Sequence, residues 1–183
     1  EGSWHNLNHK KGFRRQRQMC IRDRILASSG NSVQLWCHEH ETAKNILQKH
    51  VNTSFLPDIP LPESLGASTD LLEIVRNFRI LFAAPPSHLT REIAKKIRPE
   101  ITAEHILVIL SKGIEQHSLA LMSEIFAEEL DNLPKLAVLS GPTFAREVAL
   151  DLPSAAVLAC ADETAGSLLQ KCFHSDRFRI YRS

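Results

Sequence analysis

The stretch HILVILSKGIE, residues 105–115, places a run of branched apolar residues directly before a Lys–Gly pair. The run has the length and composition of a buried strand, and helical periodicity follows it from residue 118 to about residue 130. The apolar face of this helix is expected to carry Leu119, Met122, Ile125 and Phe126. The stretch LAVLSGPTFA, residues 136–145, has the same order: a strand, a glycine turn and a helix that begins at Pro142. Repeated strand–turn–helix units predict an α/β fold built on a mostly parallel sheet.

The same alternation extends outward from this centre in both directions. Strands are predicted at residues 32–37, 79–85, 154–161 and 178–183. Helices are predicted at residues 41–51, after a cap at Asp70, at residues 87–98 with Ser87 opening the helix, and at residues 163–173 after a cap at Asp162. Residues 52–62 hold three prolines, which predicts a loop.

The 183 residues are 43% hydrophobic and 23% charged, as in a globular protein, and no apolar run approaches the length of about 20 residues that spans a bilayer. The net charge of +1 conceals a basic segment, residues 10–24, with seven Lys and Arg against one Asp. The remainder is mildly acidic, which does not favour nucleic-acid binding. Four cysteines without CxxC spacing indicate reduced thiols in a cytoplasmic protein.

Ligands of parallel α/β sheets bind beyond the carboxyl ends of the strands, so the two turns are the candidate sites. Because consecutive strands of this kind are usually neighbours, Lys112 and the turn at Gly141 are expected to face one common crevice. Gly113 permits a positive φ in the first turn. Gly141 permits close approach of backbone, and the first N–H groups of the following helix face any anion there. The alternatives are a solvated lysine and an ordinary strand-to-helix turn. For Ser87, helix capping is a sufficient explanation.

Seven segments then stand in a specific order: GSW, NSVQLWCH, NTSFLPDIPLPESL, PPSHLTRE, LSKGIE, LSGPTFAREVA and FRIYRS. In this order they resemble the amino-terminal nucleotide-binding part of bacterial-type NAD(P)-dependent glycerol-3-phosphate dehydrogenases. The resemblance covers residues 2–4 and nearly all of residues 25–183. It implies a doubly wound, Rossmann-like domain, and hydride exchange between NAD(P)H and dihydroxyacetone phosphate that gives sn-glycerol 3-phosphate for phospholipid synthesis. It also implies a homodimer for the full-length protein.

The resemblance carries site residues over one by one. It implies that the cofactor contacts Ser3, Trp4, His38, Lys112 and Ala145, and that the substrate contacts Lys112, Gly141 and Thr143. Either NAD or NADP is expected, because Cys37 and His38 stand where NAD-specific domains carry an acidic residue, while Glu39 and Glu41 lie nearby. His38 and His40 could also begin a metal site, but two imidazoles lack a third ligand, and no metal is predicted.

The chain also departs from the family. Residues 1–9 match only a remnant of the dinucleotide-binding loop, with His5 where the family has glycine, and the family's first strand is missing. Residues 10–24 are interpreted as a foreign insert, and residues 25–183 as the NAD(P)-binding domain. The family's catalytic lysine lies in a helical domain beyond Ser183, so no catalytic residue is assigned and the chain alone is expected to be inactive.

Two other functions remain as alternatives to a dehydrogenase fragment. One is a non-catalytic dinucleotide-binding or partner-binding module. The other is a nucleic-acid binder that acts through residues 10–24, where Phe13 is the one aromatic residue.

Overall fold

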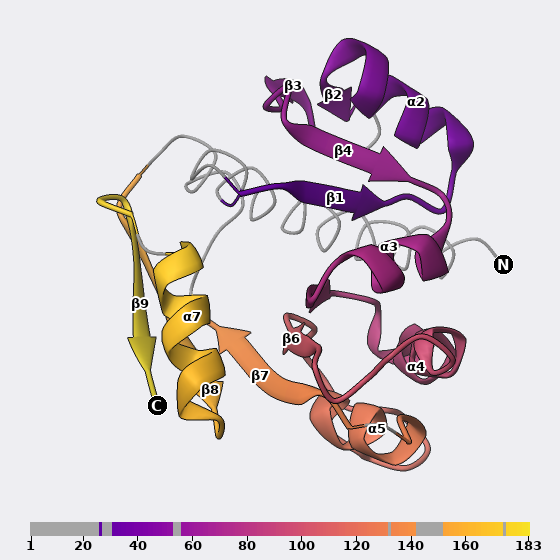
Figure 1. Ribbon diagram of the computed structural model, residues 1–183, viewed down its shortest axis with the longest axis vertical. Coiled ribbons are helices and arrows are strands. Elements are labelled where there is room, and N and C mark those ends of the chain that lie inside the picture. The colour runs from indigo at the N-terminus through magenta and orange to yellow at the C-terminus, as the bar shows by residue number, and fades with distance from the viewer. Residues whose placement is uncertain (1–25, 27–30, 53–55, 132, 142–151, 174) are drawn as a thin grey trace, which may run out of the picture. The chain divides into compact units, whose positions relative to one another are not determined.

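The computed structural model describes residues 26, 31–52, 56–131, 133–141, 152–173 and 175–183 (Figure 1). Of these, the described residues up to 69 and residues 152–153 belong to unit 1, and the described residues from 70 to 141 and from 154 to 183 belong to unit 2; each unit is described by itself. The predicted insert at residues 10–24 and the helix expected from Pro142 lie outside the described residues. No helix in the described part of the chain has the length and apolar character needed to cross a membrane.

Unit 2 is built on a five-stranded sheet with the order β5-β6-β7-β8-β9. Its strands are β5 (Ile80–Ala83), β6 (Ile106–Ile109), β7 (Lys135–Ser140), β8 (Ser154–Cys160) and β9 (Phe178–Arg182). All neighbouring pairs are parallel except β7 and β8, which are antiparallel. The prediction of a mostly parallel α/β sheet is therefore confirmed, and β8 supplies the reversed pair.

The strands of this sheet differ in how deeply they are buried. All four residues of β6 are buried, as expected for a central parallel strand covered on both faces. Strands β8 and β9 bury alternate residues: Leu158 is fully buried, whereas the cross-strand partners Val157 and Tyr181 are 46% and 56% exposed. Helix α7 (Glu163–Phe173) buries Phe173, whose ring meets that of Phe82 on β5 at a centroid distance of 5.3 Å.

Two helices of unit 2 begin at the caps that the sequence predicts. Helix α3 (Leu71–Asn77) follows Asp70, whose Oδ1 accepts the backbone N–H groups of Leu72 and Glu73, both at 3.0 Å. Helix α7 follows Asp162, whose Oδ1 accepts the N–H of Ala165 at 2.7 Å. A carboxylate at this position satisfies helix donors that have no partner within the helix, and both capping predictions are confirmed.

The predicted cap at Ser87 is wrong. Ser87 begins a 3₁₀ turn, η1 (Ser87–Leu89), and the helix α4 (Thr90–Ile97) starts only after it, without a side-chain cap. Instead, the hydroxyl of Thr90 donates back to the carbonyl of Pro86 at 3.3 Å. Two consecutive prolines keep the chain extended before this turn, which postpones the first α-helical residue.

The helix predicted from residue 118 also begins later, as α5 (Met122–Glu129). The preceding residues form a loop that a β-bridge between Ile114 and Leu121 closes. Leu119, expected on the apolar face of the helix, has a φ of 60° and is 66% exposed, so that expectation is wrong. The left-handed backbone at Leu119 breaks the helical run, and the remaining apolar stripe begins at Met122, which is buried.

The described residues of unit 1 include two short two-stranded sheets and the helix α2. These elements are β1 (Val33–Trp36), α2 (His40–Lys49), β2 (Val51–Asn52), β3 (Leu56–Pro60) and β4 (Leu65–Ser68). Strands β1 and β4 are parallel, and β2 and β3 are antiparallel. The prediction of a loop at residues 52–62 is therefore partly wrong, because β3 lies within this range. An edge strand can contain prolines where no backbone N–H is needed to donate to a neighbouring strand. Strand β4 was not predicted, since its sequence LGAS has no β-branched or aromatic residue.

Candidate functional site

The two turns singled out in the sequence meet at one edge of the sheet in unit 2. Strands β6 and β7 are parallel neighbours, so their carboxyl ends lie at the same edge. The ammonium group of Lys112, beyond β6, donates to the carbonyl of Gly141, beyond β7, at 3.3 Å. The expected proximity of the two turns is confirmed for these two residues. Thr143 and Ala145, the other members of the second turn, lie outside the described residues.

Gly141 is held by close packing against β8. A Cβ atom at this position would lie 2.8 Å from the carbonyl oxygen of Ala155 and 2.9 Å from the Cα of Ala156. Distances below 3.0 Å are essentially never found for real Cβ atoms, and both neighbours here are backbone atoms that cannot move aside cheaply. Only glycine therefore fits at the end of β7. The absence of a side chain lets Gly141, whose carbonyl accepts from Lys112, pack directly against the backbone of β8.

The turn beyond β6 is held by polar and packing contacts to the residues that precede α4. The hydroxyl of Ser111 donates to the carbonyl of Pro85 at 2.6 Å. Gly113 has a φ of 113°, in agreement with the positive φ expected for this glycine. A Cβ atom at Gly113 would lie 3.8 Å from the Cβ and Oγ of Ser87. The hydrogen bond of Ser111 attaches the turn to the segment that follows β5 and leads into α4.

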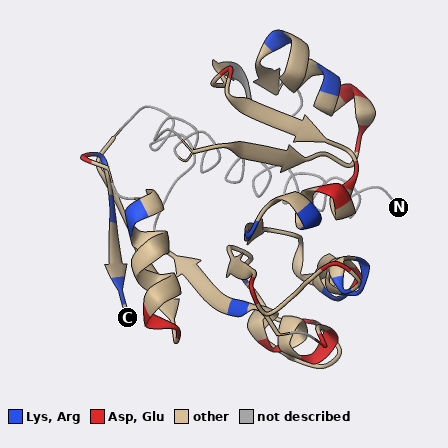
Figure 2. Ribbon diagram, in the orientation of Figure 1, with Lys and Arg blue, Asp and Glu red and all other residues tan. Residues whose placement is uncertain are grey.

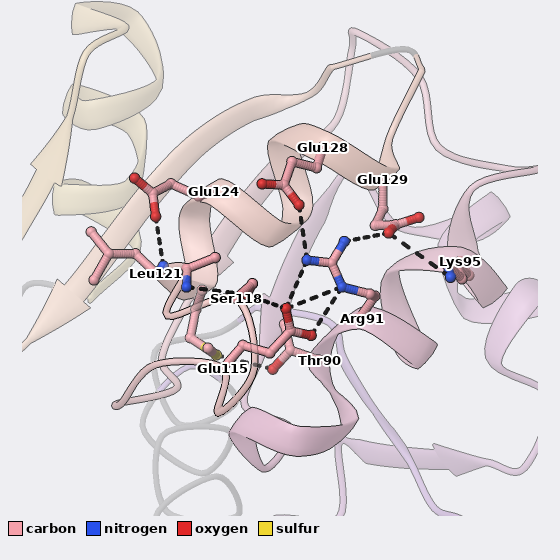
Figure 3. A network of polar contacts seen from close by, with 11 residues as sticks. Thr90, Arg91, Lys95, Glu115, Ser118, Leu121, Glu124, Glu128 and Glu129 are labelled. Atoms are coloured by element: carbon pink, nitrogen blue, oxygen red, sulfur yellow. Dashed lines mark hydrogen bonds and ion pairs between the residues drawn. The ribbon is translucent and has the colours of Figure 1, made fainter.

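A cluster of charges completes this attachment (Figure 3). The guanidinium of Arg91, on α4, makes a bidentate pair with Glu115, with Nε–Oε1 at 2.9 Å and Nη2–Oε2 at 2.8 Å. The same guanidinium donates to Glu128 at 2.8 Å and to Glu129 at 2.5 Å, both on α5. The hydroxyl of Ser118 donates to Glu115 at 2.5 Å. Figure 2 shows the corresponding pattern of basic residues on α4 and acidic residues on α5.

These contacts shift the ionisation of both members of the pair. The pKa of Glu115 falls from 4.5 to about 2, chiefly because the hydrogen bonds from Arg91 and then from Ser118 favour the carboxylate. The pKa of Arg91 is raised further above its already high value by Glu115, Glu129 and Glu128. Both groups are therefore charged at neutral pH. The sequence analysis assigned them no role, because they are far apart in the chain and no local periodicity relates them.

Lys112 is the basic group that this arrangement presents to solvent at the edge of the sheet. Its side chain is exposed, and the residue before it is held by the hydrogen bond from Ser111 to Pro85. A lysine ammonium is a compact cation with three rotatable donors, suited to a phosphate or another anion. The ammonium group of Lys112 therefore lies at the edge where parallel α/β sheets bind their ligands.

His38 lies in unit 1, just beyond the carboxyl end of β1. It is exposed, and its ring meets that of Trp36 edge-on at a centroid distance of 6.1 Å. The buried Cys37 before it donates its backbone N–H to the carbonyl of Ser68 at 2.9 Å, which fixes the end of the strand. Ser3 and Trp4 lie outside the described residues.

The side chains next to His38 are engaged locally. Glu39 accepts a hydrogen bond from the hydroxyl of Thr42 at 3.1 Å, and His40 lies 3.4 Å from the hydroxyl of Thr69. Within the described ranges no group of three or more His, Cys, Asp or Glu side chains could hold a metal ion. The described cysteines, Cys37, Cys160 and Cys172, are free thiols, as predicted.

Comparison with known proteins gives a consistent result. Residues 23–166 match the family model described as the NAD-dependent glycerol-3-phosphate dehydrogenase N-terminus. A glycerol-3-phosphate dehydrogenase [NAD(P)+] of Leptospira biflexa is 40% identical over 159 residues, which are 86% of this chain and 48% of that protein. One from Citrifermentans bemidjiense is 40% identical over 161 residues, 87% of this chain and 48% of the relative. The chain thus spans about half the length of the curated relatives that it matches.

Solved structures agree with the sequence matches. The crystal structure of glycerol-3-phosphate dehydrogenase from Coxiella burnetii superposes with a TM-score of 0.85 at 31% identity, covering 91% of this chain and 51% of that one. A pyrroline-5-carboxylate reductase from the same organism, at 9% identity and a TM-score of 0.66, shares the fold alone. The family model covers most of the chain, and the strands that carry Lys112 and Gly141 lie within it. The chain belongs to the family of NAD-dependent glycerol-3-phosphate dehydrogenase amino-terminal domains.

Proposed function

We propose that this chain is the nucleotide-binding part of a cytoplasmic enzyme that exchanges a hydride between NAD(P)H and dihydroxyacetone phosphate. The product is sn-glycerol 3-phosphate, and the proposed use of that product is phospholipid synthesis. The observation that carries the proposal is the hydrogen bond from Lys112 to the carbonyl of Gly141, which joins the two family motifs at the ligand-binding edge of the sheet.

The proposed contacts follow the family motifs. Lys112 binds both the cofactor and the phosphorylated substrate through its ammonium group, and the turn at Gly141 and Thr143 lies against the substrate. The remaining proposed cofactor contacts are Ser3, Trp4, His38 and Ala145. The described residues fit such ligands, because the exposed ammonium group of Lys112 at this edge of the sheet suits a bound anion. When bound, NAD(P)H supplies the hydride.

The proposed domain organisation assigns residues 25–183 to this domain, residues 1–9 to part of the dinucleotide loop and residues 10–24 to a foreign insert. Limited trypsin digestion tests the last assignment. Cleavage is expected first within residues 10–24, where seven Lys and Arg cluster. Earlier cleavage within residues 25–183 contradicts it.

The chain alone is proposed to be inactive. Carbonyl reduction needs a proton donor at the developing alkoxide, which contributes about two to four powers of ten, and a pocket that orients the substrate contributes more. None of the residues assigned here supplies that proton. The full-length protein, proposed to be a homodimer with a helical second domain, is expected to supply both. A non-catalytic dinucleotide-binding module would instead bind the cofactor without turnover in either form.

The test is a steady-state assay of this chain and of the full-length protein with NADH and NADPH, beside calorimetric titration of each. Replacing Lys112 with Ala in the full-length protein is expected to lower kcat/KM for dihydroxyacetone phosphate by about ten- to a hundredfold, the value of a charge-assisted contact. Lys96→Ala, which removes an exposed lysine paired with Glu92 on α4, is the matched control. Full activity of the Lys112→Ala protein contradicts the proposed site.

A further inference from the structure

Side chains of the turn beyond β6 alternate between two sides. The hydroxyl of Ser111 donates to Pro85, and a Cβ atom on Gly113 would point toward Ser87 at 3.8 Å. Glu115 pairs with Arg91, so every second residue faces the segment that leads into and begins α4. The residue between the first two, Lys112, faces the opposite way and bonds to Gly141 beyond β7. The direction of Lys112 is therefore coupled to the contacts of the residues that flank it.

Among these contacts the Arg91–Glu115 pair is the one best able to fix the turn. It is bidentate, and the two side chains are only 27% and 16% exposed, so solvent screens it less than an open surface pair. Planar guanidinium and carboxylate groups that meet through two bonds also have a defined mutual orientation. The pair thus fixes the turn in direction as well as in distance.

Further contacts hold Glu115 on its other sides. Its side chain accepts from the hydroxyl of Ser118 at 2.5 Å, and its backbone N–H donates to the carbonyl of Ala120 at 3.0 Å. The backbone N–H of Leu119 donates to the Glu115 carbonyl at 2.9 Å. Glu115 is therefore the central residue of the closed loop between the Lys112 turn and α5.

We infer that Arg91 and Glu115 form a positioning pair for Lys112: by anchoring the turn to α4 they hold the ammonium group of Lys112 at the carbonyl of Gly141. The inference rests on the proposed function in so far as Lys112 is a ligand-binding residue. It adds two residues that touch no ligand themselves and act through Lys112.

Rates of lysine acetylation by acetic anhydride, measured residue by residue with peptide mass spectrometry, test the inference in this chain without any ligand. Glu115→Gln is expected to release Lys112 and raise its acetylation rate by about three- to tenfold, the value of one hydrogen bond. The rates at Lys96 and Lys171, which lie on α4 and α7, are expected to stay unchanged.

The matched control is Glu128→Gln, which removes another carboxylate from the same guanidinium but no contact of the turn. It is expected to leave the Lys112 rate as in the unsubstituted chain. Equal acceleration in both variants would mean that the Arg91 cluster only stabilises the packing of α4 on α5, and it would overturn the inference. An unchanged Lys112 rate in a folded Glu115→Gln chain overturns it as well.

A second variant keeps the inference testable if Glu115→Gln does not fold. Ser118→Ala removes only the hydroxyl that donates to Glu115 and is expected to accelerate acetylation of Lys112 in the same direction by a smaller factor. An unchanged rate in this variant counts against the inference if Glu115→Gln does not fold.

Measurements of ligand binding by variants of the full-length protein distinguish a failure of this inference from a failure of the proposed function. In the full-length protein, Glu115→Gln and Lys112→Ala are expected to weaken binding of dihydroxyacetone phosphate, and the double variant is expected to lose no more than Lys112→Ala alone. Unchanged binding by Lys112→Ala refutes the proposed role of Lys112 while the acetylation result stands. Full additivity of the two substitutions overturns the positioning role.

Discussion

The ends of β6 and β7 are neighbours in unit 2, yet different physical forces hold them in place. The end of β7 is fixed by steric fit, because Gly141 leaves no room for a Cβ atom against the backbone of β8. The end of β6 is fixed by polar contacts, centred on the pair between Arg91 and Glu115. A steric contact does not depend on pH, whereas an ion pair does. The two strand ends should therefore respond differently to substitution and to acid.

The largest expected effect is at the sterically fixed end. Gly141→Ala places a methyl group within 3.0 Å of two backbone atoms of β8, so β7 and β8 must separate. Overpacking of this kind costs about 2 to 3 kcal/mol of unfolding free energy. Urea denaturation followed by circular dichroism measures the change. A variant as stable as the unsubstituted chain would show that the end of β7 is not held by steric fit.

Gly66→Ala, in β4, is the matched control for this substitution. Its Cβ would meet the Cγ of Gln34 at 3.5 Å, an ordinary van der Waals contact. Alanine also reduces the conformational freedom of the unfolded chain, so the free energy of unfolding is expected to stay equal or rise by up to about 1 kcal/mol.

An intermediate effect is expected for Gly113→Ala at the end of β6. There is space for a methyl group at 3.8 Å from Ser87, but the φ of 113° is unfavourable for alanine. Backbone strain at such a residue costs about 1 to 2 kcal/mol. The same denaturation assay measures this value. A loss as large as that of Gly141→Ala would mean that the turn beyond β6 is also limited by space.

The sequence was sufficient to predict the structural features that depend on residues close together in the chain. The caps at Asp70 and Asp162 and the positive φ of Gly113 follow from short-range chemistry, and the structure has all three. The proximity of Lys112 and Gly141 followed from the rule that consecutive parallel strands are neighbours.

Other features depend on partners distant in the chain and could not be predicted. Strand β4 has no strand-like composition and exists because it pairs with β1. The delayed start of α5 depends on the bridge between Ile114 and Leu121, and the role of Arg91 depends on carboxylates of a later loop and helix. Tertiary contacts of this kind override local propensity.

A smaller loss of unfolding free energy is expected when the N-cap of helix α3 is removed. Asp70→Ala removes the acceptor of two N–H groups at the start of α3, away from both strand ends. Loss of an N-cap costs about 1 kcal/mol. Asp70→Asn, which keeps an acceptor oxygen, is expected to retain most of the stability in thermal or urea unfolding. Equal losses in both variants would mean that the charge of Asp70, and not its hydrogen bonds, stabilises the helix.

The smallest effect, a local one, is expected from acid at the end of β6. The pKa of Glu115 is about 2 in the folded chain against an ordinary 4.5, because Arg91 and then Ser118 donate to the carboxylate. A pKa lowered by folding means that the open loop binds a proton more readily than the closed loop, so stability of the loop is complete above pH 4.5 and declines as the pH falls toward 2. Amide hydrogen exchange of Glu115 and Leu119, which donate within this loop, measures its opening.

After correction for intrinsic exchange rates, the protection of these two amides is expected to be constant above pH 4.5 and to fall between pH 4.5 and 2. The amide of Ala165 serves as an independent reporter, because the pKa of its cap Asp162 is also lowered, chiefly by the hydrogen bond from Ala165 itself. In Glu115→Gln the acid response of the loop should disappear while that of Ala165 persists. If instead the loop amides and Ala165 lose protection together in both chains, acid opens unit 2 as a whole, and the two strand ends do not differ in the way their contacts imply.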